Sequence, residues 1–160
     1  SRQIAKAIVE ARKEGAIDTT LKLADIVRNA MHYRKGKIDP VTKTFQAIRI
    51  HVNKELESLE RFLAQLKEML KVGGRILVVS FHSLEDGIVK SFFKEHSAKK
   101  VARSKYAKDV VNFDANKWLK IISKKPVTPS RAELLNNPRS RSSRLRVAEK
   151  IDNTEKVNVD

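Results

Sequence analysis

The residues best suited to chemistry lie together in the segment SFHSLED, residues 80–86, at the end of the apolar run RILVVSF. Ligands of open α/β sheets bind in the crevice at the carboxyl ends of the strands, so this position favours a functional site. His82 could act there as a base, as a hydrogen-bond donor or as a contact to RNA. It could equally be a loop residue that only caps the next helix, and its position alone does not decide between these roles.

Other catalytic arrangements find little support in the same segment. Ser80 and Ser83 lack the surrounding G-x-S-x-G sequence that exposes a nucleophilic serine, so we expect no serine nucleophile. Glu85 and Asp86 are adjacent, and adjacent residues of a helix point in different directions. They therefore predict capping of the following helix rather than a pair of carboxylates for acid/base catalysis.

Motifs for metal ions and phosphate groups are missing as well. The four histidines show no i,i+4 pairing and the chain has no cysteine, so we expect no metal site. Gly73 and Gly74 precede the apolar run, whereas the glycines of a dinucleotide or phosphate loop follow their strand. The sequence thus predicts no cofactor-binding residues of this kind in the chain.

Positive charge is the strongest feature of the composition. The 160 residues include 34 Lys and Arg against 19 Asp and Glu, which gives a net charge of +15. The excess is concentrated in residues 97–150, which hold 15 basic and 4 acidic side chains. Such an excess favours a polyanionic partner, with RNA, DNA and an anionic membrane all open.

The same composition bears on the compartment. The sequence has no apolar run of about 18 residues and no secretion signal, so nothing argues for secretion or a membrane span. It also lacks a helix with one lysine face and one Trp, Phe or Leu face, so we expect no membrane partner. The absence of cysteine fits a reducing environment. We therefore expect a cytoplasmic protein.

The spacing of apolar residues predicts that the first part of the chain is helical. Helices are expected over residues 1–15 and 21–31, the first ending at Gly15. After Pro40, apolar residues recur every three or four positions up to residue 70. This pattern indicates one long helix, or two helices broken near Asn53, with an apolar stripe that must be covered.

After residue 74 the pattern changes to that of an α/β protein. Residues 75–81 form a continuous apolar run, typical of a strand buried on both faces of a parallel sheet, and a helix should open at Ser83. A flexible insertion is expected next, at residues 97–116, followed by a strand at 118–123. A capping box at Ser130 and Glu133 predicts the start of a short helix, and a basic loop follows at 136–142. The last elements are a strand at 143–151 and a frayed tail.

Three segments together resemble a known family. They are FQAIRIHVNKELESLERFL, GGRILVVSFHSLEDGIVKSFF and NPRSRSSRLRVAEKI, at residues 45–63, 73–93 and 137–151. They are similar to the carboxyl-terminal part of the bacterial ribosomal RNA small subunit methyltransferase H family, which uses S-adenosylmethionine to methylate N4 of a cytidine in 16S rRNA. Two departures are Gly87, where Arg is expected, and Asp39, where His is more usual.

The resemblance implies an α/β fold that lacks its first half. Residues 1–70 would be a helical insert on the substrate side, and residues 71–151 the late part of a Rossmann-like methyltransferase domain, with 97–116 as a basic insertion and 152–160 as a tail. The strand at 75–81 would be the fifth strand of the sheet, with an open apolar edge, and the strands at 118–123 and 143–150 its last antiparallel pair. The cofactor loop would belong to the missing amino-terminal half.

The resemblance also implies roles for particular residues. Ser80, Phe81, His82 and Ser83 would line the target-base side of the cleft, with individual roles unassigned. The candidates for contacts to 16S rRNA or the small ribosomal subunit are Arg34, Lys35, Lys37, Lys43, Arg49, Arg139, Arg141 and Arg144. S-adenosylmethionine would serve the parent enzyme and would not bind this fragment, which we expect to be inactive alone. The alternative is a stand-alone basic module for RNA binding or ribosome assembly, without catalysis.

Overall fold

The computed structural model describes residues 2–32, 39–97 and 117–152, which form two compact units, Ser1–Glu55 and Leu56–Asp160. The division falls near the middle of the helical segment that runs from Pro40 to residue 70, whereas the functional boundary near residue 70 stays a prediction. Residues 98–116 of the insertion expected at 97–116, and residues 153–160 of the expected tail, lie outside the described residues.

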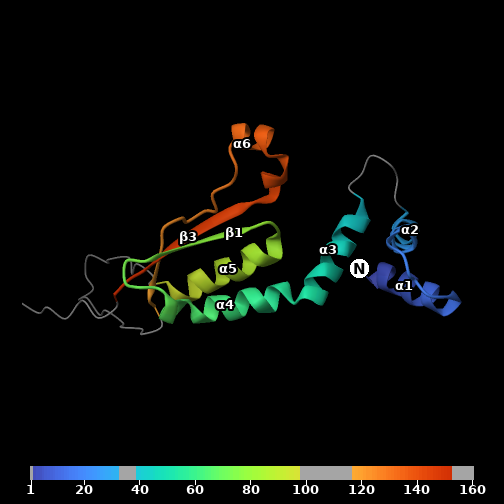
Figure 1. Cartoon of the computed structure of the whole chain (residues 1–160), viewed down its shortest axis with the longest axis horizontal. Helices are drawn as coiled ribbons and strands as arrows, with labels where there is room; N and C mark the ends of the chain where they lie inside the picture. Colours follow the sequence, from blue (N-terminus) through green and yellow to red (C-terminus); the bar gives the residue numbers. More distant parts are fainter. Residues whose placement is uncertain (1, 33–38, 98–116, 153–160) are drawn as a thin grey trace, which may run out of the picture. The chain divides into compact units, whose positions relative to one another are not determined.

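The first unit is built from three helices (Figure 1). They are α1 (Arg2–Glu14), α2 (Thr20–Ala30) and α3 (Pro40–Asn53). The Thr19 side chain accepts a hydrogen bond from the Lys22 backbone N–H and so caps α2. α2 packs against both other helices, and its Ala24 and Val27 are the buried apolar residues of this unit.

Of the two alternatives for the long helical segment, the structure has two helices, with the break at Lys54. This residue adopts the left-handed conformation, with φ 52° and ψ 39°, and its N–H donates to the carbonyls of His51 and Ile50. α3 therefore ends at Asn53, and a separate helix α4 (Glu55–Met69) follows at once. A left-handed residue ends one helix while its N–H still satisfies a terminal carbonyl, so the chain can change direction without a loop.

The second unit combines helices with a small sheet. After α4 its elements are β1 (Arg75–Ser80), α5 (Ser83–His96), β2 (Leu119–Ile121), α6 (Arg131–Asn136), the short 3-10 helix η1 (Pro138–Ser142) and β3 (Arg144–Lys150). The strand order is β1-β3-β2, and both neighbouring pairs are antiparallel. The expected antiparallel pairing of the last two strands is thus confirmed.

The expectation that the first strand is buried on both faces is wrong for the described part of the chain. Ile76 and Val78 of β1 are partly buried, whereas Leu77 and Val79 are 58% and 54% exposed. The reason is that α4 and α5 lie on one side of the strands only (Figure 1). β1 also pairs only with β3, so the sheet ends at an edge that remains open among these residues.

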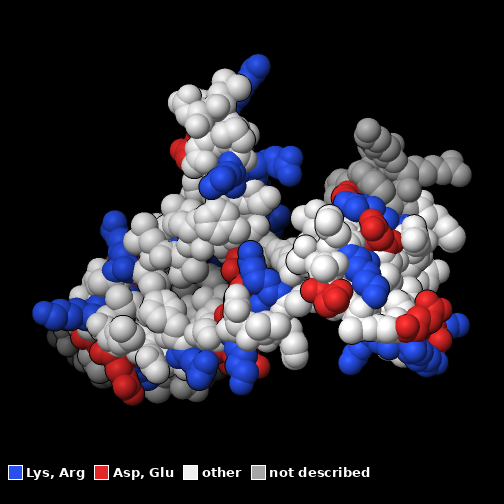
Figure 2. Space-filling view, turned by 45° about the vertical axis from the view of Figure 1, so that its right-hand side comes forward, with Lys and Arg blue, Asp and Glu red and all other residues white. Residues whose placement is uncertain are grey.

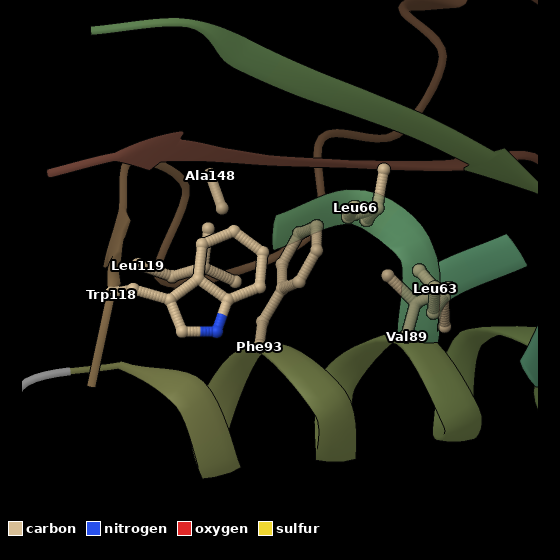
Figure 3. Close-up of a cluster of buried hydrophobic side chains, with 7 residues drawn as sticks. All are labelled: Leu63, Leu66, Val89, Phe93, Trp118, Leu119 and Ala148. Atoms are coloured by element: carbon tan, nitrogen blue, oxygen red, sulfur yellow. The ribbon is translucent and has the colours of Figure 1, made fainter. Parts of the chain in front are cut away.

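The apolar core of the second unit fills the space between these helices and the sheet (Figure 3). Helix α4 contributes Leu63 and Leu66, helix α5 contributes Val89 and Phe93, and the sheet side contributes Trp118, Leu119 and Ala148. Trp118, the chain's single tryptophan, is 4% exposed and lies in this core. Its fluorescence therefore reports on the folding of the second unit.

We predict that Gly87→Ala stabilises the second unit. A Cβ built on Gly87 meets nothing within 4 Å, and the residue lies inside α5. Replacing a helical glycine by alanine removes an entropic cost of about 0.5–1 kcal/mol. Urea unfolding followed by Trp118 fluorescence should show a higher midpoint with an unchanged slope.

Gly74→Ala is the contrasting variant for this test. Its Cβ would lie 2.7 Å from the Lys71 carbonyl oxygen, so the backbone would have to shift. This variant should unfold at lower urea. An unchanged or lower midpoint for Gly87→Ala would contradict the prediction.

Candidate functional site

The four residues expected to line the target-base side of the cleft lie where β1 passes into α5, and they divide into two pairs. Phe81 is 56% exposed and Ser83 is also exposed. Ser80 is buried, and its hydroxyl donates to the Arg144 carbonyl over 3.3 Å. The His82 side chain is only 10% exposed. Phe81 and Ser83 thus face outward, while Ser80 and His82 hold the turn from within.

His82 is the N-cap of α5. Its Nδ1 accepts a hydrogen bond from the Glu85 N–H over 3.3 Å, and the Glu85 carboxylate accepts from the backbone N–H groups of Phe81 and His82 at 2.9 and 3.3 Å. This is a capping box with histidine in the place usually taken by Ser or Thr. The capping role that the sequence left open for His82 is therefore present in the structure.

Capping determines what else His82 can do. Because Nδ1 is used as an acceptor, the proton of the neutral ring must sit on Nε2. That Nε2 is buried, lies 3.3 Å from Glu85 Oε1 and has no hydrogen-bond partner among the described residues. Neutral His82 can thus offer an N–H donor, and it could act as a base only after losing the cap.

Asp86 ties the start of α5 to β3. Arg146 binds the carboxylate with two nitrogens, Nε to Oδ1 at 2.6 Å and Nη2 to Oδ2 at 3.1 Å, and Arg144 Nη1 lies 3.0 Å from Oδ2. Asp86 and Arg146 are both buried. The hydrogen bond from Arg146 holds the pKa of Asp86 below its usual value, aided by Arg144 and opposed by burial. The backbone on both sides of the Ser80–Ser83 turn is therefore held rigidly.

The described candidates for RNA contact are found on both units. Lys43 and Arg49 are exposed on α3, and Arg49 pairs with Glu55 at 2.8 Å. The others lie close in sequence, Arg139 and Arg141 on η1 and Arg144 at the start of β3. The remaining candidates, Arg34, Lys35 and Lys37, lie outside the described residues. Within the second unit, Arg139, Arg141 and Arg144 thus follow directly after α6, where basic side chains project from the surface (Figure 2).

Asp39, one of the two departures from the expected family pattern, has a structural role in the first unit. Its Oδ1 accepts from the Val41 N–H over 3.0 Å and caps α3, while its Oδ2 accepts from Arg28 Nη2 and Nε at 2.9 and 3.1 Å. The hydrogen bond from Val41, joined by Arg28, lowers the pKa of this carboxyl. A carboxylate can thus cap α3 and hold α2 against it at the same time.

A helical unit followed by an α/β unit with a polar turn at the end of β1 defines the class of protein, an α/β protein whose sheet follows a set of helices. A family model described as the MraW methylase family matches residues 1–151. The chain belongs to this family, because the match covers nearly its whole length.

Curated relatives carry the same family resemblance in more detail. The chain is 64% identical over 151 residues to the "Ribosomal RNA small subunit methyltransferase H" of Rickettsia prowazekii and 63% identical to that of Rickettsia typhi. Each match covers 94% of this chain and 49% of the relative. The chain therefore spans about half the length of the curated relatives that it matches.

None of the helices in the described ranges has the length and apolar character needed to span a bilayer.

We predict that Asp86→Asn strongly destabilises the second unit at neutral pH. The variant leaves Arg146 buried beside a neutral amide, and removing one partner of a buried pair costs about 3–5 kcal/mol. Since the pKa of Asp86 is lowered by folding, its contribution is present above the unfolded pKa of about 4 and is lost as the pH falls further. The difference in unfolding free energy between wild type and variant should therefore shrink below about pH 4.

Glu149→Gln serves as the comparison in the same unit. Glu149 pairs with Arg75 at 2.8 Å, but the Arg75 side chain is 63% exposed. An ion pair in contact with solvent contributes about 0–1 kcal/mol, so this variant should unfold close to the wild type. If Asp86→Asn and Glu149→Gln lowered the free energy of unfolding equally, burial of the Asp86–Arg146 pair would add nothing to its contribution to stability.

Proposed function

We propose that this chain is the later part of an S-adenosylmethionine-dependent methyltransferase that acts on N4 of a cytidine in 16S rRNA, in the cytoplasm. The observation that carries the proposal is the family match over residues 1–151, together with relatives named for the RNA of the small ribosomal subunit. The exposed turn between β1 and α5 supports it, because it offers a surface where a target base can be placed.

The described residues do not fit the cofactor. The glycines at 73 and 74 precede β1, so they form no glycine-rich loop between this strand and the helix that follows it. S-adenosylmethionine would supply a methyl group from its sulfonium, and we assign its binding to the part of the protein that this chain does not cover.

The residues of the turn fit the target side of such a reaction. The exocyclic amine of cytosine shares its lone pair with the ring, so the site must orient the amine and receive its proton. Positioning dominates this type of catalysis, and a base within structured RNA must first be turned out of its stack. Phe81 is exposed enough to pack on that base, and Ser83 offers a hydroxyl beside it, while Ser80 and His82 keep the turn in place.

The remaining proposals concern the partners. The exposed basic residues Lys43, Arg49, Arg139 and Arg141, and the exposed side of Arg144, would contact RNA phosphates, as would Arg34, Lys35 and Lys37 from outside the described ranges. The amino-terminal half of the same protein would cover the apolar face of β1 at Leu77 and Val79. Covering this face with another layer would remove its apolar side chains from water, which stabilises a sheet.

We predict that Phe81→Ala impairs methyl transfer in a protein that joins residues 1–151 to the amino-terminal half of the Rickettsia prowazekii relative. Loss of an aromatic stacking contact costs about 1–3 kcal/mol, so kcat/KM should fall roughly ten- to a hundredfold. The assay measures transfer of labelled methyl from S-adenosylmethionine to small subunits that lack the modification, with the product nucleoside identified after digestion.

Phe62→Ala is the matched control, since Phe62 is 42% exposed and belongs to α4 rather than to the turn between β1 and α5. The Phe62→Ala variant should transfer methyl groups with the same kcat/KM as the wild type. An active protein that puts no label on cytidine N4 would overturn the proposed specificity. Activity that is insensitive to Phe81→Ala would overturn the placement of the base.

We also predict that residues 1–160 alone do not bind S-adenosylmethionine. The chain has no described cofactor loop and spans about half of each relative. Titration calorimetry should show no binding heat for the isolated chain and a clear signal for the joined protein. Binding by the isolated chain would contradict the assignment of the cofactor to the other half. Salt-dependent RNA binding without methyl transfer by either protein would favour the stand-alone RNA-binding module.

A further inference from the structure

The chain between β2 and β3 forms an arm that leaves the sheet beside the candidate turn. We define the arm as residues 128–143, which contain α6 and η1 and project from the sheet (Figure 1). At its base Val127 and Leu145 exchange two backbone hydrogen bonds of 2.9 Å. Leu145 and Arg144 are in turn paired with Val79 and Ser80 of β1. The arm and the Ser80–Ser83 turn therefore emerge at the same end of the sheet.

The arm is held in one conformation by its own polar contacts. The Ser130 hydroxyl accepts from the Glu133 N–H at 3.1 Å and caps α6. The buried Ser140 donates its hydroxyl to the Asn137 carbonyl at 2.7 Å, and its own carbonyl accepts from the Ser143 N–H at 2.8 Å. Side chains on the outer surface of the arm are therefore positioned before any partner binds, which reduces the entropy lost on binding.

The charges of the arm and its base are almost all positive. Residues 124–144 hold six basic side chains and one acidic one, Glu133. Five of the six are exposed and have no ion-pair or hydrogen-bond partner within the described ranges, namely Lys124, Lys125, Arg131, Arg139 and Arg141. Cations that the protein itself leaves unpaired are available to phosphate groups.

One apolar side chain stands out among these cations. Leu135 is 75% exposed on α6, while its neighbour Leu134 is partly buried, so the inner and outer sides of this short helix are distinct. Arg131 lies four residues before Leu135 and therefore on the same side of the helix. The outer side of α6 thus presents a cation and an aliphatic group next to each other.

We propose that the outer side of α6 binds unpaired RNA next to the target nucleotide, with Leu135 against the face of a base and Arg131 on an adjacent phosphate. This inference rests on the proposed function for the identity of the polyanion. RNA matches both features at once, because its phosphates need cations and its unstacked bases have apolar faces that leucine can contact. An acidic protein would use the cations but would leave Leu135 without a specific role.

The test measures binding of the 160-residue chain to fluorescent small-subunit ribosomal RNA transcripts over a series of salt concentrations. Leu135→Ser should weaken binding about tenfold with an unchanged salt slope, since it removes an apolar contact and no charge. Arg131→Gln should weaken binding and reduce the slope of log K against log salt by about one. Both side chains are exposed, so the fold should be retained, which Trp118 fluorescence checks.

The matched controls replace a leucine and an arginine that lie outside the arm. Leu21→Ser changes a leucine that is 74% exposed on α2, and Arg61→Gln removes one exposed charge from α4. Neither should weaken binding as much as its counterpart on the arm. If the arm variants bind like their controls, the inference is overturned even when the joined protein methylates cytidine. If the arm variants weaken binding but no methyl transfer is found, the proposed function fails and the RNA surface stands.

Discussion

The buried ion pair between Asp86 and Arg146 is the interaction on which the candidate site depends. It links the first turn of α5 to the central strand β3, across 60 residues of sequence. Burial of either charge without the other would be very unfavourable, so loss of one partner would weaken the packing of the two elements. Arg144 completes the arrangement from the neighbouring position of the same strand face. The turn between β1 and α5 is therefore defined by electrostatics as much as by apolar packing.

A second constraint comes from the sheet itself. α4 and α5 cover one face, and the core between them is well packed. The other face of β1 leaves Leu77 and Val79 in contact with solvent. These two residues explain why the apolar run looked like a strand buried on both sides, since its sequence suits two covered faces while the described chain supplies a layer for only one. The mismatch between sequence and environment agrees with a chain that spans half of its relatives.

Local sequence patterns predicted those features that depend on residues close together in the sequence. They did not predict side-chain contacts between residues that are far apart in the sequence. The cap at Ser130 follows from residue type and spacing, and it is present. Spacing left one long helix or two helices broken near Asn53, and the structure has two. The antiparallel pairing of the last two strands was implied by the family resemblance, and it is present as well. The role of Asp86 could not be found in this way, because its partner lies on another element. The sequence predicted that Glu85 and Asp86 would cap the following helix, and in the structure Glu85 forms the capping box at the start of α5. The roles of the predicted site residues stay a prediction, and which of these residues face outward could be seen only from the fold.

The pairing of Ser80 with Arg144 connects the two surfaces proposed to meet RNA. Arg144 directly follows the arm, pairs through its backbone with the last residue of β1 and shares the Asp86 carboxylate through its side chain. The next residue, Leu145, pairs with Val79 of β1 on one side and bonds to Val127 at the base of the arm on the other. In the proposed function, RNA held on α6 and η1 would therefore lie at the same end of the sheet as the turn. β3 would then join RNA binding to the placement of the target base, because it contacts both the base of the arm and the end of β1.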